Sequence, residues 1–313
     1  MAVSFDDIAR AAERVRDIAH LTPVMTSRLF DERAGVQAFF KCENLQRGGA
    51  FKIRGASNFA HSMSPADLRR GLVACSSGNH AQAVAIVSKA LGAAATIVMP
   101  EDSPRSKMQA TREYGANVVM FNRQRDDRDA IARHIAEETG ATFVPPYDHP
   151  WTIAGQGTVA LELLRQVSDF DALMTPIGGG GLMAGCSTVV RALRPAMRIF
   201  GVEPADANDT WLSLRAGERV SIPAPTTAAD GLRAPTPGAI TFPIVQKNVD
   251  AILLVSEQEI REAVHFLLTR MKILVEPSGA VCAAAALFGK LPPDIGRVGI
   301  VLTGGNLDLD YLT

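Results

Sequence analysis

The feature that most constrains the fold of this chain is the near-unbroken alternation of strand-like and helix-like segments. Helical patterns are separated by short apolar runs, and one helix start carries a capping box formed by Ser256 and Glu259. The runs predicted to be strands read VQAFFK, GLVACS, AATIVMP, NVVMF, ALMTPI, RIFGVE, AILLV and RVGIVLT. Such alternation is typical of an α/β protein whose sheets are mostly parallel.

One stretch interrupts this alternation. Residues 222–243 are dense in proline and threonine, which predicts an ordered loop that crosses a surface. With 313 residues, of which 47% are hydrophobic, the chain is long enough for one large or two modest domains with real cores.

Composition argues against several classes of protein. The formal net charge is −1 and charges of both signs are scattered, so we expect no nucleic-acid partner and no membrane partner. The first twenty residues mix acidic and basic side chains and resemble neither a secretory signal nor a transit peptide. No apolar run reaches the roughly 18 residues that span a bilayer. The four cysteines are widely spaced, which indicates neither disulfides nor zinc and favours the cytoplasm.

Four glycine-centred segments follow predicted strands or open predicted helices: GAFKIRG, CSSGNHAQ, PIGGGGLMAG and VLTGGN. In open α/β sheets, ligands collect at the carboxyl ends of the strands, where glycine lets backbone N–H groups approach an anion. We therefore expect all four segments to face one crevice.

The run of glycines from Gly178 to Gly181 predicts a phosphate site. Consecutive glycines cost conformational entropy, and a series of backbone N–H groups before a helix forms a nest for a phosphate. An alternative is a nicotinamide dinucleotide, because residues 179–184 fit G-x-G-x-x-A and Glu203 follows about twenty residues later. That alternative leaves Lys52 and two glycine turns without a role.

The turn from Ser76 to His80 follows a predicted strand and opens a predicted helix. Backbone N–H groups and the helix dipole at such a turn can bind a carboxylate, while serine and asparagine side chains bond elsewhere. His80 taken alone is expected to be structural.

Lys52 lies between Phe51 and Ile53, which is unusual for a residue that is commonly a solvated surface charge. A lysine among apolar side chains loses hydration, so its pKa falls and its neutral amine becomes a nucleophile and a base. Together with a phosphate nest and a carboxylate-binding turn, this lysine points to pyridoxal phosphate, whose aldehyde reacts with a lysine.

These motifs resemble the fold type II pyridoxal-phosphate enzymes, which have a tryptophan synthase β-like fold, and within them the threonine/serine dehydratase and serine racemase family. The matching motifs are FKIRGASN, SSGNHAQAVA, PPYDHPWTIAGQGT, GGGGLMAG, MKILVEPSGA and VLTGGN, which span essentially the whole chain. The resemblance implies a large domain made of residues 1–67 and 149–313 and a small mobile domain made of residues 68–148. It also implies a homodimer.

The resemblance implies roles for individual residues. Lys52 is expected to be bonded to the cofactor, Asn79 to bond the ring hydroxyl, and Thr303 to meet the pyridine nitrogen. The full cofactor-binding set is Phe51, Lys52, Asn79, Gly178, Gly179, Gly180, Gly181 and Thr303. The substrate-binding set is Ser76, Ser77, Gly78, Asn79, His80 and Arg128. The match is incomplete at Ala50, where the family commonly has a hydroxyl residue.

The implied activity is an ammonia-lyase (dehydratase) reaction. It converts a β-hydroxy L-amino acid (threonine, serine or 3-hydroxyaspartate) to a 2-oxo acid and ammonia by α,β-elimination, with Lys52 as the base. The alternative is a serine racemase with side dehydratase activity, because Ser77 matches a serine on the opposite face of the substrate. Two further alternatives are a nicotinamide dehydrogenase and a non-catalytic binding protein.

A divalent-cation site is also implied. Glu203 and Asp209, with the carbonyl of Ala207, match the cation site of the racemase-like branch, and hard oxygen ligands suit Mg²⁺, Ca²⁺ or Mn²⁺. Only LDLDYLT follows the last glycine turn, so we expect no C-terminal regulatory domain and no isoleucine feedback through one.

Overall fold

Two separate sheets form the framework of the molecule. The computed structural model describes residues 3–76, 78–103, 105–122, 124–308 and 311. The strands are β1 (Val24–Met25), β2 (Gln37–Cys42), β3 (Leu72–Cys75), β4 (Ala95–Pro100), β5 (Asn117–Phe121), β6 (Thr142–Phe143), β7 (Ala172–Pro176), β8 (Arg198–Pro204), β9 (Ala251–Val255) and β10 (Arg297–Leu302). The eight predicted strands are all present. The two-residue strands β1 and β6 were missed because neither has an apolar run.

The larger sheet has six strands in the order β1-β2-β10-β7-β8-β9. Only the short β1 is antiparallel to its neighbour, and the other pairs in this sheet run parallel. The smaller sheet has four parallel strands in the order β5-β4-β3-β6. The predicted α/β class with mostly parallel sheets is therefore confirmed.

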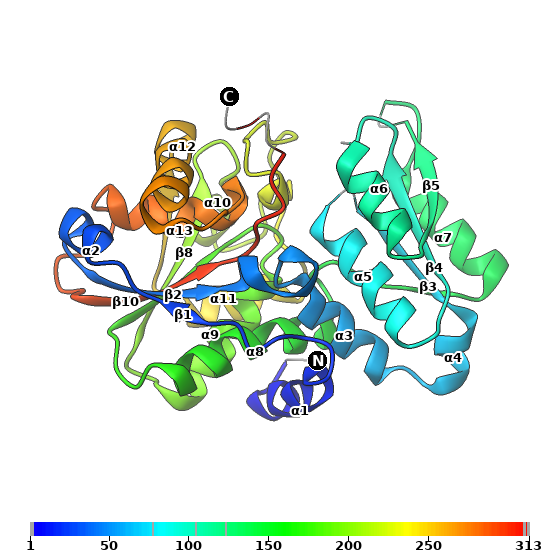
Figure 1. Ribbon diagram of the computed structural model, residues 1–313, viewed down its shortest axis with the longest axis horizontal. Helices are drawn as coiled ribbons and strands as arrows, with labels where there is room; N and C mark the ends of the chain where they lie inside the picture. The colour runs from blue at the N-terminus through cyan, green and yellow to red at the C-terminus, as the bar shows by residue number, and fades with distance from the viewer. Residues whose placement is uncertain (1–2, 77, 104, 123, 309–310, 312–313) are drawn as a thin grey trace.

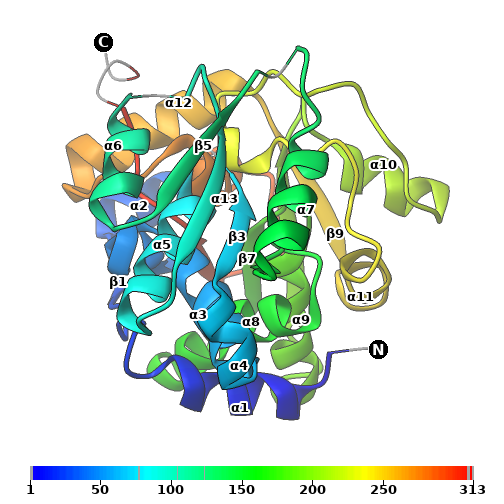
Figure 2. The same ribbon diagram turned by 90° about the vertical axis from the view of Figure 1, so that its right-hand side faces the viewer.

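The helices cover the faces of both sheets (Figures 1 and 2). They are α1 (Phe5–Val15), α2 (Arg28–Ala34), α3 (Lys52–Ser62), α4 (Pro65–Arg70), α5 (Asn79–Ala90), α6 (Arg105–Glu113), α7 (Arg128–Thr139), α8 (Pro150–Gln166), α9 (Gly181–Leu193), α10 (Asp209–Ala216), α11 (Thr241–Asn248), α12 (Glu257–Phe266) and α13 (Pro277–Leu287). Short 3₁₀ turns occur at Glu43–Leu45, Arg47–Gly49 and Asp230–Leu232, and a π-helical turn occurs at Leu267–Met271.

The larger sheet lies between two apolar layers. One core packs α13 against the sheet and beneath α12, and the other packs α8 and α9 against the opposite face. Helix α13 is buried along its whole length, and its small alanine and glycine residues allow it to lie close to the strands. The predicted capping box is confirmed at the start of α12, where the Ser256 hydroxyl accepts a hydrogen bond from the backbone N–H of Glu259.

The smaller sheet is built from residues 72–143 and stands apart from the larger one, at the right of Figure 1. Its strands lie within the predicted small domain of residues 68–148, whose boundaries remain a prediction. Helix α3 packs against both α5, beside the small sheet, and α8, beside the large one, and so links the two parts.

The proline-rich stretch at 222–243 runs as a loop with one 3₁₀ turn until α11 begins at Thr241. Among the described residues, no helix combines the length and the apolar character that crossing a bilayer requires.

Candidate active site

Lys52 is the first residue of α3, in the segment that follows the carboxyl end of β2. Its side chain is half-buried, and Nζ donates a hydrogen bond to the Pro146 carbonyl at 2.8 Å. Burial lowers the pKa of Lys52 to about 8, and the nearby Glu276 carboxylate partly opposes that shift. The amine is therefore close to the ionisation range in which a lysine can act as a nucleophile and a base.

Backbone hydrogen bonds join the TGGN turn after β10 to the segment that carries Lys52. Ala50 and Gly304 form an isolated antiparallel bridge, and the Phe51 N–H donates to the Thr303 carbonyl at 3.0 Å. The Gly305 N–H donates to the Gly49 carbonyl at 2.9 Å. Thr303 itself is buried. The two predicted segments thus lie together, as expected.

Asn79 opens α5 and reaches across to the larger part of the molecule. Its Nδ2 donates to Glu276 Oε1 at 2.7 Å, and its Oδ1 accepts from Asn306 Nδ2 at 2.8 Å. Asn306 also donates to the Gly48 carbonyl at 2.8 Å. Three segments distant in sequence therefore meet at Asn79. Its predicted bond to a cofactor hydroxyl has not been tested.

The glycine loop follows β7 and leads into α9. Gly180 has φ +89°, a left-handed conformation that favours glycine, and it immediately precedes the first residue of α9. A side chain at Gly179 would collide with the ring of Tyr147, and the Gly179 carbonyl accepts from Thr241 Oγ1 at 2.7 Å. The loop is thus enclosed by other segments, with glycine required at this close contact.

The enclosing segments are themselves held by Asp148. Its Oδ1 accepts backbone N–H groups of Ile240 at 2.8 Å and Thr241 at 3.1 Å, and its Oδ2 accepts that of Ala239 at 2.8 Å. These bonds join the chain before α8 to the start of α11, on the side of the glycine loop where Tyr147 lies.

The turn after β3 carries the predicted carboxylate-binding residues. The Gly78 N–H donates to Ser76 Oγ at 3.2 Å. His80 is buried, and its Nε2 bonds the Val144 carbonyl at 2.9 Å. Burial and the Lys52 charge lower the pKa of His80 to about 3, so its side chain is neutral and braces the turn. Ser77, the predicted second catalytic residue, lies outside the described residues.

Arg128 is exposed at the first residue of α7. Its predicted approach to the substrate remains a prediction.

A pair of buried carboxylates lies where β8 ends and α10 begins. Glu203 accepts the N–H groups of Thr210 at 3.1 Å and Trp211 at 2.9 Å, whereas both carboxylate oxygens of Asp209 are buried without a hydrogen-bond partner among the described residues. Burial, reinforced by repulsion from Asp209, raises the pKa of Glu203 to about 8, and burial raises that of Asp209 to about 7. Ala207, which lies between Glu203 and Asp209 in the sequence, is also buried.

This pair fits a cation in its chemistry, because two carboxylates without a counter-charge are held away from water. Within the described part of the chain, no group of three or more histidine, cysteine, aspartate or glutamate side chains could hold a metal ion. Any cation here would therefore need backbone carbonyls or water as further ligands.

The surroundings of Lys52 fit pyridoxal phosphate. They provide an amine of lowered pKa, a run of glycines before a helix N-terminus and an amide side chain at Asn79. Sequence reasoning assigned no role to Glu276, Tyr147, Pro146 or Asn306, although all four lie in motifs that were quoted. Their side chains or carbonyls matter through distant contacts, which a linear pattern does not display.

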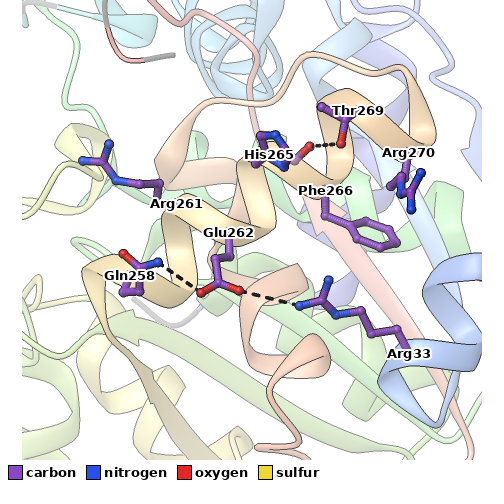
Figure 3. A pocket seen from close by; sticks show the side chains of 8 residues that line it. All are labelled: Arg33, Gln258, Arg261, Glu262, His265, Phe266, Thr269 and Arg270. Carbon is purple, nitrogen blue, oxygen red and sulfur yellow. Dashed lines mark hydrogen bonds and ion pairs between the residues drawn. The ribbon is translucent and has the colours of Figure 1, made fainter. Parts of the chain in front are cut away.

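A separate groove of about 690 Å³ lies along α12 (Figure 3). Glu262 there accepts from Gln258 Nε2 at 3.1 Å and pairs with Arg33 Nη2 at 3.6 Å. The described residues that line this groove include none of the predicted site residues, so it is distinct from the candidate active site.

Comparison with known proteins gives a family match. The family model described as "Pyridoxal-phosphate dependent enzyme" matches residues 15–304. The L-threo-3-hydroxyaspartate ammonia-lyase of Saccharomyces cerevisiae is 48% identical over 98% of this chain and 94% of its own. The serine racemase of Schizosaccharomyces pombe is 44% identical over 98% of this chain and 95% of its own. The solved structure of maize serine racemase superposes with a TM-score of 0.96 at 40% identity, covering 100% of this chain and 96% of that one.

Proposed function

The chain belongs to the family of pyridoxal-phosphate-dependent enzymes, and from that premise we propose that it is an ammonia-lyase acting on a β-hydroxy L-amino acid. Its products are a 2-oxo acid and ammonia. The predicted fold type II architecture and the predicted family are confirmed. The nicotinamide alternative is set aside, because the family match covers residues 15–304.

The observation that carries the proposal is the environment of the Lys52 amine. The amine is half-buried, its pKa is lowered to about 8, and it donates a hydrogen bond to the Pro146 carbonyl, which supports its predicted role as the cofactor-bonded lysine. The Pro146 carbonyl holds it in place by a hydrogen bond that any reaction partner of the amine would replace.

In the proposed reaction, the cofactor, Lys52, the turn at residues 76–80 and His80 each have a separate role. Pyridoxal phosphate, when bound, supplies an electron sink for the bonds broken at the substrate α-carbon. Lys52 would hold the cofactor through its amine and would also act as the base that removes the substrate α-proton. The backbone N–H groups of residues 76–80 bind the substrate carboxylate at the start of α5. His80 takes no part in proton transfer, because it is neutral and bonded to Val144.

The glycine loop and Thr303 orient the cofactor in this proposal. Gly178 to Gly181 would hold its phosphate at the start of α9, and Tyr147 lies against one side of this loop. Thr303 would offer the pyridine nitrogen a neutral hydroxyl, where an aspartate would offer a charge.

The substrate is tested with a panel of threonine, serine and 3-hydroxyaspartate stereoisomers. The name of the Saccharomyces relative supports measuring L-threo-3-hydroxyaspartate first. We expect 2-oxo acid and ammonia in equal amounts from at least one member. Reduction of the loaded enzyme with borohydride should fix the cofactor to Lys52, as read from the peptide mass. A cofactor fixed at another lysine would contradict the assignment.

Racemisation is the second candidate function. Ser77 matches the position of a second base, and the fold superposes closely on maize serine racemase. The same panel is therefore scored for loss of optical purity. Racemisation that persists in Ser77→Ala would argue against a two-base site.

A divalent cation at Glu203 and Asp209 belongs to the same proposal. Its support is the pair of unpartnered oxygens on Asp209 beside a second buried carboxylate. A chelator should lower the melting temperature, and Mg²⁺, Ca²⁺ or Mn²⁺ should restore it. The homodimer, the mobile small domain of residues 68–148 and the cytoplasmic location are further expectations, which gel filtration, hydrogen exchange and fractionation would test.

A further inference from the structure

We infer that Arg54 is a positioning residue for Lys52: a buried ion cluster around Arg54 fixes the first turn of α3 against α8 and so holds the Lys52 amine at the Pro146 carbonyl. The ion cluster consists of Lys41, Glu43, Arg54 and Glu162. This role rests on the proposed function in one respect, namely that Lys52 is the residue bonded to the cofactor.

Arg54 lies two residues after Lys52 and is fully buried. Its Nε and Nη2 donate to the two carboxylate oxygens of Glu43 at 2.7 and 2.8 Å. Its Nη1 and Nη2 donate to the two oxygens of Glu162 at 2.7 Å each. The guanidinium therefore forms paired bonds with two carboxylates at once, an arrangement with little rotational freedom.

Lys41, at the end of β2, completes the cluster. Its Nζ donates to Glu162 Oε2 at 2.7 Å, to the Thr22 carbonyl at 2.8 Å and to Gln166 Oε1 at 2.9 Å. Thr22 Oγ1 in turn donates to Glu43 Oε1 at 2.6 Å. Two cations thus balance two anions, and the bonds tie β2, α3 and α8 together.

Stability alone does not require such a cluster. Taking charges out of water is costly, and well-packed apolar side chains of similar volume often replace a buried ion pair without loss of stability. The directional bonds instead fix one arrangement of the helices that carry them. That arrangement matters here because Arg54 is within one helical turn of Lys52.

Helices α3 and α8 are attached to each other at two levels. Deep in the core, Arg54 bonds Glu162 of α8, and a side chain at Gly155 would collide with the Arg54 carbonyl. Near the site, Gln156 of α8 donates to the Pro146 carbonyl at 3.2 Å, the same oxygen that accepts from Lys52. A shift of α3 along α8 would therefore break the ion cluster and move Lys52 from its acceptor together.

The groups that face the Lys52 amine are Glu276, from the turn before α13, and His80, from α5. Because burial is the larger cause of the lowered pKa of Lys52, a looser first turn that admits water would raise it toward 10.5. A measurement of the Lys52 pKa therefore detects a displacement of the first turn of α3.

The test compares Arg54→Lys with the unchanged chain. After removal of the cofactor, the rate of Lys52 acetylation by acetic anhydride is measured against pH by peptide mass spectrometry. We expect the midpoint for Arg54→Lys to rise by about one pH unit. In the loaded enzyme, we expect kcat to fall about 100-fold with little change in KM. Lys52 acetylation needs no substrate, so a wrong substrate assignment would leave this readout intact.

The matched control is Arg191→Lys at the far end of α9. Arg191 also makes several hydrogen bonds, to the Asn248 and Met197 carbonyls and to Asp250, at a partly exposed position. We expect this variant to melt earlier and to keep the Lys52 midpoint. If Arg54→Lys also melts earlier but leaves the Lys52 midpoint and kcat unchanged, Arg54 is structural and the inference fails.

A second variant guards against a protein that does not fold. Glu162 is 20% exposed, so Glu162→Gln removes one charge at a more tolerant position and keeps the side-chain shape. We expect a smaller rise of the Lys52 midpoint than for Arg54→Lys. If neither variant folds, the ion cluster serves stability alone and the inference is overturned.

Discussion

The molecule contains two groups of buried charged residues, the ion cluster around Arg54 and the pair Glu203 and Asp209, and they differ in whether positive and negative charges balance. In the ion cluster, two cations and two carboxylates satisfy each other through bonds of 2.7 to 2.8 Å. At the end of β8, Glu203 and Asp209 are also buried, but both are acidic, and in the part of the chain that the structure describes the oxygens of Asp209 have no hydrogen-bond partner. The charges of the ion cluster are balanced within it, whereas the described residues around Glu203 and Asp209 supply no ion pair to either carboxylate.

The difference is visible in the ionisation of the two groups. In the ion cluster, the charge of Arg54 overcomes burial and holds the pKa of Glu43 below its ordinary value. At the carboxylate pair, burial and repulsion act in the same direction and raise the pKa of Glu203 to about 8. A balanced group serves as a fixed internal support, whereas an unbalanced group is suited to taking up a cation.

Removing the Arg54 charge from the ion cluster should have the largest effect on stability. Arg54→Met leaves Glu43 and Glu162 buried without their shared cation, so the free energy of unfolding should fall by about 3–5 kcal/mol, as measured by urea denaturation. The double variant Arg54→Met, Glu43→Gln removes one of the stranded charges and should recover part of the loss. A single variant as stable as the unchanged chain would show that the cluster is dispensable.

Supplying the missing charge to the carboxylate pair should give the next largest effect. At a concentration about 100 times its dissociation constant, a bound cation stabilises the folded state by about 2.7 kcal/mol. The melting temperature at pH 8 should therefore rise with Mg²⁺, Ca²⁺ or Mn²⁺. Asp209→Asn is the control and should abolish the rise. A rise that persists in Asp209→Asn would place the cation elsewhere.

The pH dependence of the metal-free protein tests the same pair without a ligand. The folded-state pKa values, about 8 for Glu203 and about 7 for Asp209, lie above the ordinary values of 4.5 and 3.8. Because the unfolded chain releases these protons first, stability is fully present below about pH 4 and is lost as the pH rises through 7 and 8. In Glu203→Gln, the part of this loss that Glu203 contributes should disappear. An identical pH profile in that variant would contradict the raised pKa.

Removing one charge of the unbalanced pair should have the smallest effect, and in the opposite direction. Asp209→Asn relieves the repulsion on Glu203, so the metal-free protein at pH 8 should gain stability on the order of 1 kcal/mol. Urea denaturation with chelator present measures it. A loss of several kcal/mol would indicate that Asp209 has a partner that the pair itself does not reveal.

The comparison also shows what a sequence can disclose. The eight main strands were predictable, because apolar runs are local patterns with known geometry. The glycine loop and Lys52 could be selected from the sequence as candidates, because glycine turns are local patterns too, but their roles remain predictions. Glu203 and Asp209 were suggested only through the family resemblance, since acidic residues of this kind are usually solvated.

The ion cluster was not predicted at all. Lys41, Glu43 and Arg54 look like ordinary charged residues in the sequence, and Glu162 is more than a hundred positions from its partners. Their pairing depends on how β2, α3 and α8 pack, which no local pattern encodes. The same holds for Glu276, whose contact with Asn79 joins residues that are 197 positions apart.

The most direct test of the account is the release of 2-oxo acid and ammonia from L-threo-3-hydroxyaspartate, serine and threonine, comparing the unchanged enzyme with Lys52→Ala. The exposed Lys89 provides the control variant Lys89→Ala. We predict equal amounts of both products from at least one substrate, a rate at least about 10³-fold lower in Lys52→Ala, and an unchanged rate in Lys89→Ala. Turnover that survives in Lys52→Ala, or no product from any of the three, would contradict the account.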